Sequence, residues 1–77
     1  MEEKKVFEYP IIIEKANGNY SAYCPDLSGC IATARTLGET RKLMKEAIRL
    51  HIEGMKKEGL PIPAPHSKIE YVKVAVY

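Results

Sequence analysis

A long segment without proline, residues 36–59, restricts the fold of this chain more than any other feature. It opens with Thr36 and Glu39, spaced as in a capping box, in which the hydroxyl bonds the amide of the third helical residue and the carboxylate bonds back to the cap. It closes with Gly59, which can take the left-handed conformation that ends many helices. The segment therefore predicts one helix from Thr36 to Glu58, about 33 Å long at ~1.5 Å per residue.

The predicted helix is amphipathic. At about 100° per residue its apolar side chains fall within one broad arc, together with one histidine, and several basic residues lie opposite. We expect the apolar side of such a helix to lie on a sheet. The arc holds Leu37, Leu43, Met44, Ala47, Ile48, Leu50, His51, Ile52 and Met55.

Two strands joined by a tight turn are expected before the helix. From Val6 to Lys15, apolar side chains alternate with charged ones at the period of two that is typical of a strand. Pro10 has no amide hydrogen, so this strand should lie at an edge of the sheet or contain a bulge. Asn17-Gly18 suits the two left-handed positions of a type I′ turn, which makes Asn19–Tyr23 the returning strand.

A loop of turn-forming residues follows, from Cys24 to Cys30. Pro25 fixes its own φ, Asp26 can bond to nearby backbone amides, and Gly29 tolerates a positive φ. A third short strand, Ile31–Ala34, is expected after this loop. The three strands would then form an antiparallel meander.

The segment after the helix, residues 59–65, contains three prolines and should run extended. It leads to a last predicted strand, Ile69–Tyr77, in which Val72, Val74 and Val76 line one face. The element order is strand, strand, strand, helix, strand. This predicts an α+β fold (β-β-β-α-β), with an antiparallel sheet and one long helix packed on one face. No internal repeat or flexible linker interrupts the sequence, so residues 1–77 should form a single domain.

The size of the chain predicts a partner. A domain of 77 residues buries only roughly 60% of the surface of its unfolded form, and one helix cannot cover both faces of a four-stranded sheet. We expect a homodimer, with a tetramer as the open alternative.

The longest apolar runs, such as Ile11–Ile13, are far below the ~18 residues of a membrane span, and no basic-then-apolar leader opens the sequence. A cytoplasmic location without membrane contact is therefore expected.

One tyrosine and the turn that follows it are the candidate partner-binding residues. Tyrosine joins an aromatic body to a polar tip and often anchors interfaces. Strand alternation turns Tyr23 away from its neighbours Ala22 and Cys24, so one of these sets faces away from the helix. The candidate set is Tyr23, Pro25, Asp26 and Leu27.

The basic side of the predicted helix gives a second hypothesis, a stand-alone nucleic-acid-binding protein. Several cations in a stripe can neutralise phosphates, although such a stripe is more often a solvated surface. The formal net charge is only +2, and Glu46 and Glu53 are spaced to pair with part of the stripe. Direct binding of nucleic acid is therefore the weaker alternative. Its candidate residues are Lys42, Lys45, Arg49 and Lys56.

Catalytic chemistry has little support in the sequence. Cys24 and Cys30 lack the second cysteine pair of a zinc site, and we interpret them as small buried hydrophobic residues. His51 and His66 have no nucleophile or carboxylate placed beside them by spacing. A metal-dependent nuclease would need several converging acids, and only Asp26 has a distinctive context. We expect no catalytic residue, no metal and no cofactor, and keep a degenerate nuclease as a third hypothesis.

Motifs in a fixed order span nearly the whole chain: Gly18-x-Tyr20-x-Ala22, Cys24-Pro25-Asp26-Leu27-x-Gly29-Cys30, Thr36-Leu37, Ala47-Ile48 and Gly59-Leu60-Pro61-Ile62-Pro63-x-Pro65. Together they resemble the HicB-like antitoxin family. The resemblance implies a partly reduced ribonuclease-H-like fold that often forms dimers or tetramers. It also implies inhibition and not catalysis, because such antitoxins bind and occlude HicA, a small RNA-cleaving toxin. Many members carry a further C-terminal DNA-binding domain, and we expect this chain to be a short form without it.

Overall fold

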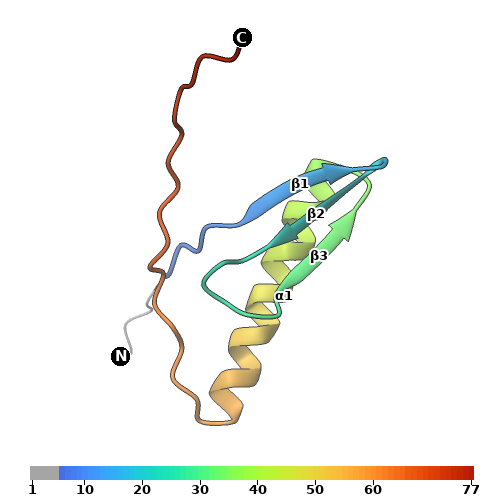
Figure 1. Cartoon of the computed structure of the whole chain (residues 1–77). Coiled ribbons are helices and arrows are strands. Elements are labelled where there is room, and N and C mark those ends of the chain that lie inside the picture. The colour runs from blue at the N-terminus through green and yellow to red at the C-terminus, as the bar shows by residue number, and fades with distance from the viewer. Residues whose placement is uncertain (1–5) are drawn as a thin grey trace.

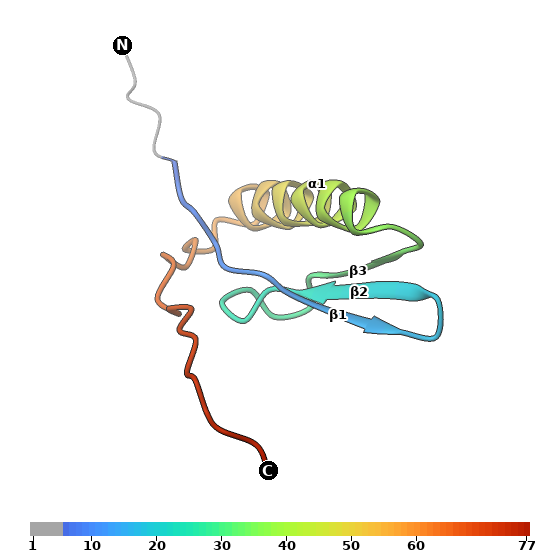
Figure 2. The same cartoon turned by 90° about the horizontal axis from the view of Figure 1, so that it is seen from above.

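The computed structural model describes residues 6–77, so the first five residues of the predicted domain lie outside the described part. Strands β1 (Ile12–Ala16), β2 (Asn19–Tyr23) and β3 (Ile31–Ala34) form one antiparallel sheet in that spatial order. Helix α1 (Leu37–Lys57) follows them and lies across one face of the sheet, while the other face is uncovered (Figures 1 and 2). The predicted α+β fold with one long helix on an antiparallel sheet is confirmed.

The hairpin between β1 and β2 forms as its turn residues predict. Asn17 and Gly18 have φ values of 43° and 81°, and two successive positive values are typical of a type I′ turn. The first strand is shorter than predicted, because it begins at Ile12 and not at Val6. Pro10 cannot donate to a strand ladder, and the residues around it approach the sheet without pairing.

Helix α1 ends as expected, and at its start the described residues show one of the two hydrogen bonds of the predicted capping box. The Thr36 hydroxyl accepts a hydrogen bond from the Glu39 amide at 3.1 Å, and the Thr40 hydroxyl donates to the Thr36 carbonyl at 2.7 Å. The helix ends at Lys57, and Gly59 follows with a φ of 71°, as expected for a left-handed cap. No helix among residues 6–77 has the length and apolar character needed to cross a membrane.

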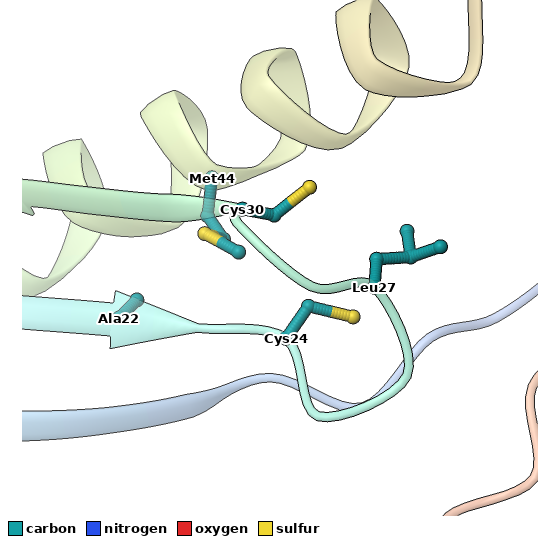
Figure 3. Packing of buried hydrophobic residues seen from close by; sticks show 5 residues of the cluster. All are labelled: Ala22, Cys24, Leu27, Cys30 and Met44. Atoms are coloured by element: carbon teal, nitrogen blue, oxygen red, sulfur yellow. The ribbon is translucent and has the colours of Figure 1, made fainter. Parts of the chain in front are cut away.

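The core lies between α1 and the loop that joins β2 to β3 (Figure 3). Met44 of α1 is fully buried and Leu27 of the loop is almost so. The predicted apolar arc of the helix is only partly buried, because the backbone of α1 lies close to β2 and β3 but not to β1. The leucines at its margins, Leu37, Leu43 and Leu50, are exposed. The buried hydrophobic residues are Ala22, Cys24, Leu27, Cys30 and Met44.

The last predicted strand is not part of the sheet, and this expectation is corrected. Residues 60–77 run extended but form no strand, and the end of the chain lies far from both the sheet and α1 (Figure 1). The physical reason is that a strand needs a neighbour for its amides and carbonyls, and among the described residues no segment pairs with residues 60–77. The molecule is accordingly long, measuring 56 × 27 × 21 Å along its principal axes.

Candidate protein-binding surface

The face of the sheet that α1 leaves uncovered carries three apolar side chains in a line. Tyr23 of β2 lies opposite Ile12 of β1 and Ile31 of β3 in the register of the sheet. Ala22, the neighbour of Tyr23, is fully buried, so strand alternation turns Tyr23 and its two partners outwards. Their exposed fractions are 39% for Ile12, 40% for Tyr23 and 65% for Ile31. We call these three residues the outer row.

The next line of side chains on the same face is polar. Glu14, Ser21 and Thr33 lie opposite one another in the register, and the Thr33 hydroxyl donates to the Ser21 hydroxyl at 3.4 Å. The apolar part of this face is therefore confined to the end that borders the loop after β2. An apolar patch with a polar border is typical of a surface that binds another protein.

The loop at that end, residues 24–30, is held by its own backbone. The Leu27 amide donates to the Cys24 carbonyl at 3.3 Å, and the Cys30 amide donates to the Leu27 carbonyl at 3.4 Å. Gly29 has a φ of 86°, a conformation that side chains other than glycine adopt with strain. These bonds turn Leu27 into the core and leave Pro25, two residues after Tyr23, exposed.

Asp26 of this loop binds the segment that follows the helix. Its side chain is covered, and it accepts hydrogen bonds from the Ser67 hydroxyl at 2.5 Å and from the amides of His66 and Ser67 at 3.1 and 3.3 Å. The His66 ring nitrogen Nε2 lies 3.2 Å from the same carboxylate. The Ser67 hydroxyl, the two amides and the His66 ring hold the pKa of Asp26 below its usual value, against the opposing effect of burial.

A second contact holds the proline-rich segment a few residues earlier. The Tyr9 hydroxyl donates to the Pro63 carbonyl at 2.5 Å. Burial, together with the negative charge of nearby groups such as Asp26, raises the pKa of Tyr9, so its hydroxyl keeps its proton and stays a donor. The segment from Leu60 to Ser67 is thus fixed at two points beside the loop. We call it the connector.

The structure divides the four candidate partner-binding residues into two pairs. Tyr23 and Pro25 are exposed and face outwards, and Asp26 and Leu27 are buried and hold the chain together. Sequence reasoning missed Ile12 and Ile31, although strand alternation and the register across the hairpin could have placed them beside Tyr23. It also missed Ser67, for which the sequence carries no signal.

The basic stripe of α1 is partly neutralised by its own helix. The Arg49 guanidinium bonds the carboxylates of Glu46 at 2.6 Å and Glu53 at 2.7 Å. Paired guanidinium groups are less available to phosphates, so the structure gives no added support to a nucleic-acid site. The other members of the stripe, Lys42, Lys45 and Lys56, are exposed.

The two cysteines are free and buried in the core, which confirms the interpretation of them as small hydrophobic residues. Burial raises the pKa of the Cys30 thiol, so this group stays protonated and unreactive. His51 is half-buried on α1. Within residues 6–77, no three histidine, cysteine or acidic side chains are grouped as metal ligands.

The sequence and the fold of this chain match those of known proteins. The model of the HicB-like antitoxins of bacterial toxin–antitoxin systems matches residues 9–76. The chain belongs to this family. This HicB-like chain is also 39% identical over 69 residues to a 14.9 kDa protein of the rep-hol intergenic region of Haemophilus phage HP1. The match covers 90% of the chain but 52% of the phage protein, so this HicB-like chain spans about half the length of that relative.

Shorter relatives match along more of their length. A UPF0150 protein of Synechocystis is 38% identical over 61 residues, which is 78% of the chain and 77% of the relative. A UPF0150 protein of Thermoplasma acidophilum is 37% identical over 62 residues, which is 79% of the chain and 90% of the relative.

A solved structure places the HicB-like fold in a known kind of assembly. A chain of a HicA3 and HicB3 toxin–antitoxin complex superposes with a TM-score of 0.66 at 37% identity. The superposition covers 78% of this chain and 70% of that one. At this identity the likeness supports both the fold and the family.

Proposed function

We propose that this chain is an antitoxin that binds a small HicA-type RNA-cleaving toxin and inhibits it by covering its active surface. The observation that carries the proposal is the match at 37% identity to a chain of a HicA3 and HicB3 complex, together with the HicB-like family model over residues 9–76. The protein would act by binding and not by catalysis.

The outer row and Pro25 form the toxin-binding surface in this proposal. The row combines an aromatic and two aliphatic side chains on a rigid sheet, and hot spots of interfaces are enriched in such aromatic anchors. Asp26 and Leu27 contribute indirectly, because they fix the loop that presents Pro25.

The protein would work in the cytoplasm as a homodimer. Cys24 and Cys30 are both free thiols, which suits a reducing compartment. The exposed apolar surface of the last residues supports self-association.

Co-expression tests the proposal. A HicA-type toxin encoded beside this chain should arrest growth, and the wild-type chain should restore it. Ile31→Lys places a charge in the outer row and should abolish the rescue, because the interface would bury an unpaired ammonium group. Thr33→Lys, two residues along the same strand and face, is the matched control and should still rescue. If the wild-type chain neither binds the toxin nor restores growth, the antitoxin proposal is wrong.

A further inference from the structure

The last ten residues of the chain, 68–77, form an apolar segment with no place in their own molecule. We call them the tail. The exposed fractions of Tyr71, Val72 and Val76 are 93%, 82% and 91%, so these apolar side chains contact almost nothing in their own chain. The radius of gyration is 15.1 Å, against about 11.5 Å for a folded domain of this length. The tail extends away from the sheet and α1 in both views (Figures 1 and 2).

The sequence of the tail is that of a strand. Val72, Val74 and Val76 alternate with Tyr71, Lys73 and Ala75, and β-branched and aromatic residues are the types that favour sheets. An extended segment of this kind has a full row of amides and carbonyls that need partners. It therefore suits an exposed sheet edge more than solvent.

The edge of β1 is such a site. β1 is at one end of the sheet order, so its outer side has no neighbouring strand among the described residues. The backbone of α1 does not lie close to β1, and a hollow of about 230 Å³ opens between α1 and the residues that precede β1. It is lined by Phe7, Tyr9, Ile11, Arg41, Met44, Lys45 and Ile48. A strand added at β1 would have an apolar surface to extend.

The connector sets where the tail leaves the body, and in this structure the tail does not pair with β1 of its own chain. Asp26 fixes His66 and Ser67, and Tyr9 fixes Pro63, so the chain leaves the body at a set position. The first residues of the tail, 68–71, border a second hollow of about 400 Å³ beside Ile11–Ile13, and the tail then diverges from β1 (Figure 1). The tail is presented outwards by a fixed anchor and not by a loose hinge.

We propose that two copies of this chain exchange their tails, each tail adding as an outer strand to the β1 edge of the other copy. The valine row of the exchanged tail faces the side of the sheet that carries α1, where it extends the core beyond Ile11 and Ile13. This rests on the homodimer proposed above and specifies how that dimer is built. The exchange gives hydrogen-bond partners to the backbone amides and carbonyls of both the tail and the β1 edge. Twofold symmetry repeats the same contact in both copies.

Light scattering on the full chain tests the stoichiometry. The wild type is a dimer at micromolar concentration. Val74→Asp places a carboxylate in the valine row and shifts the population to monomer, whereas Lys73→Asp, the adjacent residue on the opposite row, leaves the dimer intact. Neither position contacts the core, so far-ultraviolet circular dichroism should show the same helix content in all three proteins. A wild-type monomer, or a dimer that Val74→Asp does not weaken, overturns the exchange.

Isotope-filtered nuclear Overhauser spectra on a mixed sample of labelled and unlabelled chains locate the tail. Contacts between Val72–Val76 of one copy and Ile11–Ile13 of the other are expected. Contacts of the tail with its own chain, or between the two tails alone, contradict the proposal. Neither measurement uses a toxin, so a failure here leaves the antitoxin proposal standing, and a failed growth rescue leaves the exchange standing.

Discussion

Asp26 and Ser67, 41 positions apart in the chain, are joined by a hydrogen bond of 2.5 Å from the serine hydroxyl to the aspartate carboxylate. This bond connects the loop beside the outer row to the root of the tail. A single buried carboxylate therefore joins the loop that carries Pro25 to the segment from which the tail departs. Its charge state controls how firmly the connector is held.

The stability of the connector should depend on pH through Asp26. The folded state lowers the pKa of this carboxyl below its ordinary value of 3.8, chiefly through the Ser67 hydroxyl. The stabilisation is thus complete above the ordinary pKa and is lost as the pH falls through the lower, folded value. A titration of the Asp26 carboxyl carbon by NMR should give a midpoint below 3.8, and Ser67→Ala should move it upwards. A midpoint at or above the ordinary value would show that the bonds to Ser67 and His66 do not form in solution.

The small core should depend strongly on Met44. Met44→Ala removes a fully buried side chain between α1 and the loop, and the resulting cavity should lower the free energy of unfolding by about 2–5 kcal/mol. Leu50→Ala, on an exposed margin of the same helix, should change it by less than about 0.5 kcal/mol when the protein is monomeric. Urea unfolding of both variants in the Val74→Asp background measures the difference, and equal losses would place the core elsewhere.

The start of α1 depends on one hydroxyl. Thr36→Ala removes the acceptor of the Glu39 amide and should destabilise the fold by about 1 kcal/mol. Thr36→Asp keeps an acceptor at the same position and should retain the stability of the wild type. Thermal unfolding compares the three proteins. If the alanine and aspartate variants melt together, the cap does not contribute.

The parts of the fold that the sequence predicted are those set by neighbouring residues. The Asn17-Gly18 turn, the Thr36 cap and the Gly59 end of the helix each depend on local backbone conformation, and each is found where expected. The class of the fold follows from these elements and their order.

The parts that the sequence did not predict depend on distant contacts. Nothing near Asp26 in the chain indicates that Ser67 returns to it, so Asp26 was expected to face a partner. The last strand was expected in the sheet because Val72, Val74 and Val76 alternate correctly, but alternation does not say which chain supplies the neighbouring strand. How much of each leucine side chain on α1 is covered depends on the width of the sheet. No local sequence pattern predicts that width.

Inhibition of a toxin by direct binding can be measured in a cleavage assay with purified proteins. Increasing amounts of the chain are added to a fixed amount of the HicA-type toxin encoded beside it, and the rate of RNA cleavage is measured. We predict that cleavage falls in proportion to added chain and stops at a fixed stoichiometry, and that Ile31→Lys has no such effect while Thr33→Lys acts as the wild type does. Cleavage that continues unchanged in the presence of excess wild-type chain would show that this protein does not inhibit the toxin.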